Sequence, residues 1–168
     1  LLHTQNEPQV EGTTFRADEG EGRLFCRTLL PSAAALAKIG GPDKEFWSNG
    51  RNWDVNDSVL AQQERQRAKT GKGMLWGNWR IEVAPTAART DDLFLHVLQV
   101  GDAALQTMVA TETIREPDQV GVRFAYAGRE FEVRFGTTGD PTGRIRLARE
   151  GQAPVDRELT RAVQPQKG

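Results

Sequence analysis

Apolar and polar residues alternate with a period of two through most of the chain. In the segment 78–85 (NWRIEVAP), Trp79, Ile81 and Val83 fall on one face and charged residues fall between them. Successive residues of a strand point to opposite faces of a sheet, so this pattern predicts half-buried strands. The same alternation recurs in four more segments, 22–31, 106–114, 120–135 and 144–150.

The segment 92–100 (DLFLHVLQV) is apolar on both faces, which predicts a central strand covered on both sides. Turn-forming residues separate the strands, and Gly128 in AYAGR is placed to give a hairpin turn its positive φ. Short strands at such spacing predict an all-β fold, an antiparallel β-sandwich or two-layer sheet. We expect one antiparallel β-domain over residues 1–150 and a polar tail over 151–168.

One segment departs from this pattern. Residues 56–73 contain strong helix formers and a plausible N-cap at Ser58, but few apolar residues for a buried stripe. This composition predicts one short surface helix or loop around 56–72. The chain also opens on Leu1 in a strand-like LLHT, so we expect it to be the excised C-terminal part of a longer protein.

Composition narrows the classes of function. The formal net charge is −1, which gives no field that would attract nucleic acid or an anionic membrane, and we expect neither partner. No apolar run approaches the roughly 20 residues that cross a bilayer. The single cysteine, Cys26, excludes an internal disulfide. The sequence contains no glycine-rich phosphate loop, nucleophile elbow or zinc-ligand spacing, so no metal site is predicted.

The two histidines, His3 and His96, are the obvious candidates for proton transfer. His96 lies between Phe94 and Leu98 on an apolar face, which favours a core or interface histidine over a base or a metal ligand. His3 lies in the opening LLHT segment, where it is either a sheet residue or a catalytic group.

The segment 44–54 (KEFWSNGRNWD) has the composition of a sugar-binding loop. Trp47 and Trp53 flank a turn-forming SNG, and Arg51 lies between them. Indole rings stack on the C–H faces of sugars, while a guanidinium bonds to carboxylates or hydroxyls. The alternative is a loop that is held in shape by its own aromatic residues. Of the other two tryptophans, Trp79 is predicted to be in the core, and Trp76 is not assigned to that face.

Several blocks, taken in order, resemble the C-terminal β-domain of heparinase II/III-like polysaccharide lyases. The blocks are LLHTQNEPQVEG, GEGRLFCRTLLP, IGGPDKEFW, NWRIEVAP, DLFLHVLQVGD and VGVRFAYAGREFEVRFG, and together they cover roughly residues 1–149. The resemblance implies a parent protein with an N-terminal α/α toroid followed by antiparallel β-layers. It also implies a bacterial protein that is secreted or periplasmic.

The reaction implied by the resemblance is β-elimination in glycans that contain uronic acids, heparin- or heparan-sulfate-like or alginate-like. A base removes the proton beside the carboxylate, and an acid assists the leaving sugar. In such lyases the toroid and an early H-x-H-x-D-like strand supply these groups, sometimes beside a divalent metal. This chain has neither, so no catalytic residue of the family can be matched to it, and any metal belongs to the missing part of the parent. We expect no cofactor in this chain.

Three interpretations therefore stand. In the first, the chain supports the toroid of a lyase and contacts the acidic polysaccharide without cleaving it; His3 is the only candidate catalytic residue, and Trp47, Arg51 and Trp53 are the candidate glycan-binding residues. In the second, it is a stand-alone carbohydrate-binding module that uses those three residues. In the third, it is a structural domain that docks on the toroid through an apolar face.

Overall fold

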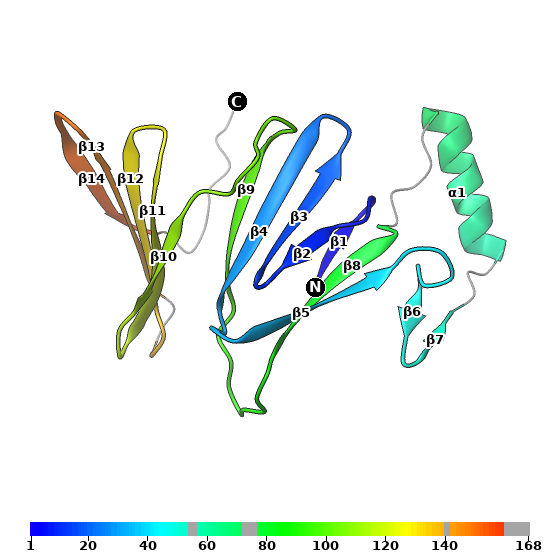
Figure 1. Cartoon of the computed structure of the whole chain (residues 1–168), viewed down its shortest axis with the longest axis horizontal. Helices are drawn as coiled ribbons and strands as arrows, with labels where there is room; N and C mark the ends of the chain where they lie inside the picture. The colour runs from blue at the N-terminus through cyan, green and yellow to red at the C-terminus, as the bar shows by residue number, and fades with distance from the viewer. Residues whose placement is uncertain (54–56, 72–76, 140–141, 160–168) are drawn as a thin grey trace. The chain divides into compact units, whose positions relative to one another are not determined.

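The computed structural model of the protein describes residues 1–53, 57–71, 77–139 and 142–159. Contacts group the chain into two compact units, Leu1–Gln106 and Thr107–Gly168, where the sequence predicts a single domain over 1–150. In chain order the elements are β1 (Leu2–Thr4), β2 (Gln9–Glu11), β3 (Thr14–Glu19), β4 (Gly22–Leu30), β5 (Ala34–Gly40), β6 (Trp47–Ser48), β7 (Arg51–Asn52), α1 (Asp57–Thr70), β8 (Trp79–Pro85), β9 (Leu95–Asp102), β10 (Thr111–Arg115), β11 (Gln119–Tyr126), β12 (Arg129–Gly136), β13 (Gly143–Arg149) and β14 (Gln152–Glu158) (Figure 1).

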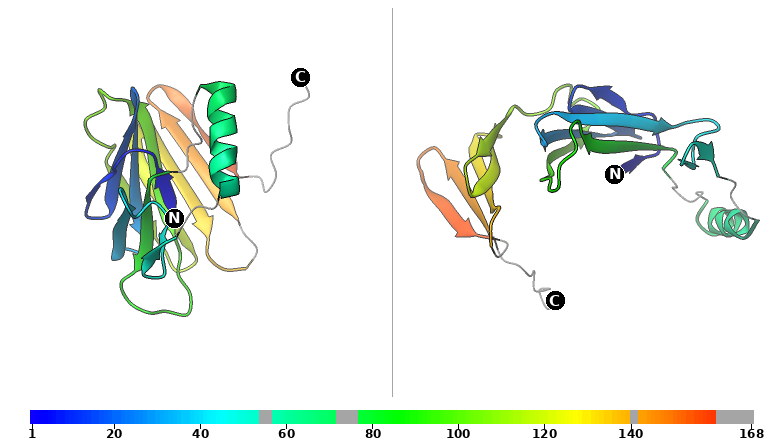
Figure 2. Two further views of the ribbon diagram at one scale, coloured as in Figure 1. Left: turned by 90° about the vertical axis from the view of Figure 1, so that its right-hand side faces the viewer. Right: turned by 90° about the horizontal axis from the view of Figure 1, so that it is seen from below.

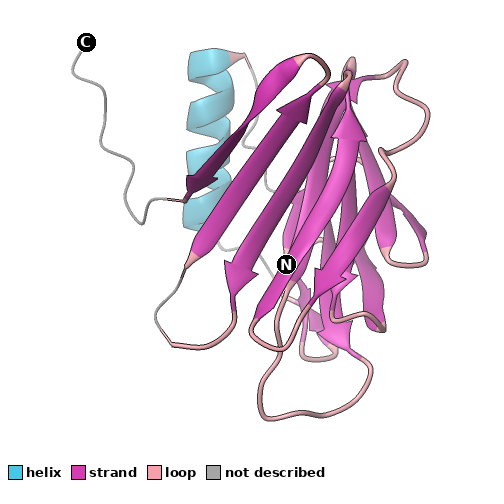
Figure 3. Ribbon diagram, turned by 90° about the vertical axis from the view of Figure 1, so that its left-hand side faces the viewer, coloured by secondary structure: helices cyan, strands magenta, loops and turns pink. Residues whose placement is uncertain are grey.

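The first unit is a two-layer antiparallel structure. One sheet has the strand order β1-β8-β5 and the other has the order β2-β3-β4-β9, while β6 and β7 form a separate hairpin. The two sheets pack face to face around a shared cluster of buried residues, Phe15, Ala17, Cys26 and Ile81 (Figure 2). The predicted all-β antiparallel sandwich is therefore confirmed, and Figure 3 shows how strands dominate the fold.

The core of this unit follows from the alternation in the sequence. Ile81 of β8 is fully buried, and Phe15 of β3 pairs with Cys26 of β4, each about 1% exposed. Burial raises the pKa of the Cys26 thiol to about 11, so the side chain stays protonated and packs as a small apolar residue.

Strand β9 corrects one expectation. The sequence predicts a central strand here, but β9 is the outermost strand of its four-stranded sheet. Leu98 and Val100 pair with Cys26 and Leu24, on the face that carries the core, yet they are 53% and 75% exposed. The apolar pattern here thus belongs to an edge strand that leaves Leu98 and Val100 in solvent while Leu95 and Val97 are half-buried. An uncovered apolar stripe of this kind is typical of a docking surface.

The helix α1 has 14 residues and lies within the segment for which the sequence predicts a short helix or loop. Its described side chains are exposed apart from the half-buried Val59. Arg67 and Lys69 lie in its last turn, where cations interact favourably with the helix dipole. Within the described ranges, no helix is long and apolar enough to span a membrane.

The second unit is a five-stranded antiparallel meander, β10 to β14 in chain order. Its hairpin between β11 and β12 turns at Ala127 and Gly128, which have φ values of 50° and 70° and lie between the paired Tyr126 and Arg129. Two consecutive positive φ values are the signature of a type I′ turn, and the predicted hairpin is confirmed.

The end of the chain differs from the sequence prediction. Residues Gln152–Glu158 form β14, which pairs with β13, where the sequence predicts a polar tail from 151 onwards. All seven residues of β14 are exposed. The strand is outermost in its sheet and all its side chains are exposed, so it is held by backbone pairing with β13 and needs no buried apolar face, which is why its composition is typical of a tail.

Candidate functional site

The hairpin β6–β7 forms the centre of the predicted sugar-binding loop. Trp47 pairs with Asn52 and Ser48 with Arg51. The two residues between them, Asn49 and Gly50, have φ values of 51° and 79°. Asn-Gly is the preferred sequence of a type I′ turn, because both positions require a left-handed backbone. The SNG motif thus folds back tightly and brings Arg51 next to the turn.

Arg51 and Trp53 form one unit on this hairpin. The guanidinium carbon of Arg51 lies 3.4 Å from the centroid of the Trp53 ring, a stacked cation–π contact. The Trp53 indole Nε1 donates a hydrogen bond of 3.0 Å to the carbonyl of Ser48, which fixes the orientation of the ring. Trp53 is nevertheless 46% exposed, so a flat, oriented aromatic surface with an attached cation faces solvent.

Trp47 lies apart from this unit. Because it pairs with Asn52, its side chain shares a face with Asn52, and the next residue, Trp53, points to the opposite face. Trp47 has a different cation on its ring, Lys44, whose Nζ lies 5.4 Å from the ring centroid. The structure therefore brings together two of the three predicted residues, Arg51 and Trp53, and does not place Trp47 beside them.

Asn52 has a structural role in this loop. Its Oδ1 accepts a hydrogen bond of 2.8 Å from the backbone N–H of Phe46, and the Trp53 N–H bonds to the Phe46 carbonyl at 3.3 Å. Part of the polar character of the segment thus serves to hold the loop in shape, as the alternative interpretation of the sequence expected. The guanidinium of Arg51, in contrast, has no hydrogen-bond partner among the described residues and keeps its N–H groups for a ligand.

His3 lies at the rim of a separate cavity of about 420 Å³ in the first unit. It is an exposed residue of β1 that pairs with Arg80 of β8. Gly77 lies so close that a Cβ at that position would be 2.7 Å from the Cβ of His3. Further lining residues are Ala17, Leu24 and Val100, which give the cavity an apolar wall, and Gln5.

The polar groups of this cavity do not form a catalytic set with His3. Asp18 is held by Arg23 through hydrogen bonds of 2.7 and 3.1 Å, which lower the pKa of the Asp18 carboxyl. The buried Oε1 of Gln5 lacks a hydrogen-bond partner within the described part of the chain. No group of three or more His, Cys, Asp or Glu in the described ranges is arranged to hold a metal. A catalytic role of His3 therefore stays a prediction from the sequence.

His96 has a hydrogen-bond partner and an aromatic neighbour within the fold. Its Nδ1 lies 3.1 Å from the hydroxyl of Thr28, which is 3% exposed, and its ring stacks on Phe94 with centroids 6.3 Å apart. Burial lowers the pKa of His96, so the neutral ring is favoured. These contacts support the structural interpretation of this residue.

The other two tryptophans, Trp76 and Trp79, are not part of the hairpin. Trp79 packs so tightly on Gly41 that a Cβ there would lie 2.6 Å from its ring, and Lys38 lies 5.4 Å from the ring centroid. It is half-buried in β8, as part of the framework. Trp76 lies outside the described residues.

Comparison with known proteins adds no assignment of function, since no protein-family model and no curated protein matches the chain.

Proposed function

We propose that this chain is the C-terminal β-sandwich domain of a polysaccharide lyase whose parent protein β-eliminates glycans that contain uronic acids. The glycan is heparin- or heparan-sulfate-like, or alginate-like. In this proposal the chain supports an N-terminal α/α toroid that carries the acid and base, along with any divalent metal. The parent is a secreted or periplasmic bacterial protein, and this chain contacts the acidic polysaccharide without cleaving it.

One observation carries the proposal: most of the blocks behind the family resemblance contain antiparallel strands, either in the two-layer first unit or in the meander of the second unit. NWRIEVAP spans β8, DLFLHVLQVGD contains β9, and VGVRFAYAGREFEVRFG contains the β11–β12 hairpin. Blocks that resemble a β-framework in sequence therefore have the role of a β-framework in the structure.

The contact with the glycan is assigned to Arg51 and Trp53. The exposed indole offers a face to the C–H groups of a sugar ring, and the guanidinium offers N–H groups to a carboxylate or sulfate on the same sugar. A uronic acid presents both features within one residue. The pair is preorganised by its own stacking and by the bond from Trp53 to Ser48, which reduces the entropy lost on binding.

The same pair favours a second candidate, a stand-alone carbohydrate-binding module, since it needs no other domain to present its surface. A third candidate, a structural docking domain, is favoured by the exposed Leu98 and Val100 on β9. The third differs from the other two in predicting no affinity for any glycan.

Replacing single residues of the hairpin tests the assignment. We expect Trp53→Ala to weaken binding of mannuronate or heparin oligosaccharides about tenfold or more, because it removes both the stacking face and the support of Arg51. Isothermal titration calorimetry measures the affinity. Trp47→Ala is the matched control, an indole on the other face of the same hairpin, and we expect little change. The opposite ranking of the two variants would show that the site is assigned to the wrong face.

A further inference from the structure

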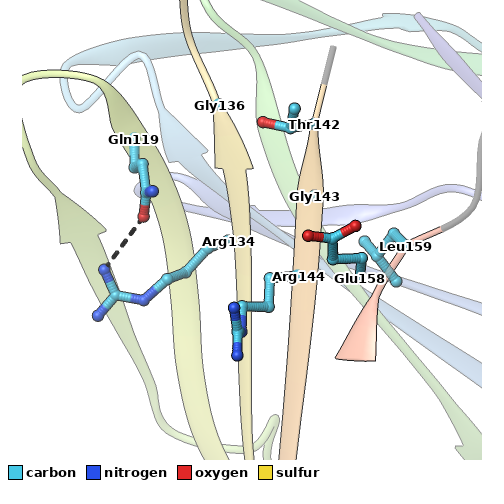
Figure 4. A pocket seen from close by; sticks show the side chains of 8 residues that line it. All are labelled: Gln119, Arg134, Gly136, Thr142, Gly143, Arg144, Glu158 and Leu159. Atoms are coloured by element: carbon cyan, nitrogen blue, oxygen red, sulfur yellow. Dashed lines mark hydrogen bonds between the residues drawn. The ribbon is translucent and has the colours of Figure 1, made fainter. Parts of the chain in front are cut away.

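The second unit contains a cleft of about 540 Å³ that no sequence pattern predicts (Figure 4). It lies on the sheet β10–β14, and its walls come from β11, β12, β13 and β14 and the residues next to them. The lining residues are Gln119, Arg134, Gly136, Thr142, Gly143, Arg144, Glu158 and Leu159. Its volume is within the range of about 300–1,000 Å³ that is typical of small-molecule sites.

Strand register assembles the charged wall of this cleft. Arg134 of β12 pairs with Arg144 of β13, which pairs in turn with Glu158 of β14. Directly paired residues of neighbouring antiparallel strands carry their side chains on the same face of the sheet. Gln119 is placed at the same edge because it pairs with Gly136, and it accepts a bond of 3.5 Å from Nη1 of Arg134.

The two arginines are already neutralised by neighbouring carboxylates. Arg134 donates bonds of 2.6 Å to both Glu116 and Glu132, and Arg144 donates a bond of 2.6 Å to Asp156. These bonds raise the pKa of both guanidinium groups. Glu158 adds one more negative charge to the cleft wall. The local charge balance therefore does not favour an anion as the ligand.

The groups left without partners are a mixture of donors and acceptors. Among the described residues, the side chains of Thr142 and Glu158 have no hydrogen-bond partner, and the Arg144 side chain donates only through its Nε, which leaves its two terminal nitrogens as donors. The amide nitrogen of Gln119 is a further donor. A ligand hydroxyl both donates and accepts a hydrogen bond, so neighbouring hydroxyls of a sugar ring match an arginine beside a carboxylate better than a charged group does.

Two glycines allow the side chains of Thr142 and Leu159 to pack directly against the strands that line the cleft. A Cβ on Gly136 would lie 2.3 Å from Oγ1 of Thr142, and a Cβ on Gly143 would lie 2.8 Å from Cδ1 of Leu159. Leu159 also supplies an apolar wall, which suits the C–H face of a sugar.

From these features we propose that the cleft binds a neutral sugar unit through its hydroxyls. The proposal rests on the proposed function only in taking a glycan as the ligand class. It is a second site, separate in residues and in chemistry from Arg51 and Trp53. Binding at the hairpin depends on an ion pair and weakens with salt, whereas binding in this cleft is nearly independent of salt.

The test uses the whole chain and two matched ligands, mannotetraose and the mannuronate tetramer, which differ in carrying a hydroxymethyl group or a carboxylate. Cellotetraose serves as a second neutral probe. NMR titration gives both the affinity and its location. We expect a neutral tetramer to shift the amide signals of Gly136 and Gly143, with less than a twofold change in affinity between low and high salt.

Variants then assign the contact. Thr142→Val removes a hydroxyl at constant shape, and Glu158→Gln removes the acceptor charge; we expect each to weaken neutral-sugar binding about three- to tenfold. Arg146→Gln, on the same face of the same strand but outside the cleft wall, is the matched control and should change little. Circular dichroism confirms that each variant is folded.

The outcomes separate the two proposals. If neither neutral tetramer binds, or if both Thr142→Val and Glu158→Gln leave the affinity unchanged, the sugar cleft is overturned. If neither mannuronate nor heparin oligosaccharides bind, or if they bind equally well to the Trp53→Ala variant, the hairpin assignment in the proposed function fails while the result on the cleft stands.

Discussion

Replacing Phe15 by alanine is expected to lower the free energy of unfolding of the first unit by about 3–5 kcal/mol. Phe15 is 1% exposed and lies in the cluster shared by the two sheets, against Cys26 and Ile81. Alanine would lose the transfer energy of the ring and leave a cavity, because the sheets on both sides are held by their ladders of hydrogen bonds. A domain is typically stable by about 5–15 kcal/mol, so this is a large fraction of the total.

Urea denaturation followed by tryptophan fluorescence measures this effect selectively. All four tryptophans belong to the unit Leu1–Gln106, so their emission does not report on the second unit. Val10→Ala is the control: Val10 lies in the neighbouring strand β2 but is 36% exposed, and we expect a change within about 0.5 kcal/mol. A loss below about 1 kcal/mol for Phe15→Ala would contradict the position of the core.

The second large effect is expected for Gly40→Ala, at about 3 kcal/mol or more. Gly40 has a φ of 141°, which L-residues rarely adopt, and a Cβ there would lie 2.2 Å from the carbonyl oxygen of Asn78 and 2.6 Å from Cα of Trp79. These atoms belong to the backbone and cannot move aside as a side chain does. The substitution thus combines backbone strain with overpacking at the end of the β5–β8 ladder.

Gly20→Ala separates the two contributions. Gly20 also has a positive φ, 56°, but no atom lies within 4 Å of the position of its Cβ. We expect this control to cost about 1 kcal/mol from strain alone. The same fluorescence measurement applies to both variants. Equal losses for the two glycines would show that the close approach of Asn78 to Gly40 has no energetic weight.

Much of the framework follows from period-two alternation. The pattern around Ile81 predicts a half-buried strand, and β8 carries that residue at the centre of the core. Turn chemistry is equally local, so Gly128 predicts the β11–β12 hairpin from its immediate neighbours. Both signals lie within a few residues of the feature they predict.

Features that depend on neighbouring strands are harder to predict. The apolar faces of β9 indicate burial. Whether Leu98 and Val100 are covered depends on whether another strand or layer follows β9, and β9 pairs only with β4 at the edge of its sheet. The strand β14 has the composition of a tail because an outermost strand needs no apolar residues. In both cases the position in the sheet, not the local pattern, determines the outcome.

The candidate sites show the same division. The Asn-Gly turn and the aromatic residues beside it lie within a few residues of one another, so the sequence alone identifies this hairpin as a candidate binding segment. The separation of Trp47 from Trp53 follows from the pairing of Trp47 with Asn52, which a change of register by one residue would reverse. The cleft in the second unit joins Arg134, Arg144 and Glu158 from three strands, and no local signal predicts that register.

The central claim is that this chain binds an acidic glycan and leaves it intact. Titrating the 168-residue chain with mannuronate and heparin oligosaccharides, and following the ultraviolet absorbance of unsaturated uronates in the same mixtures, tests both halves together. We expect saturable binding of an acidic oligosaccharide that weakens with salt, and no rise in absorbance. An absorbance that rises with time, or the absence of binding to every acidic glycan, would contradict it.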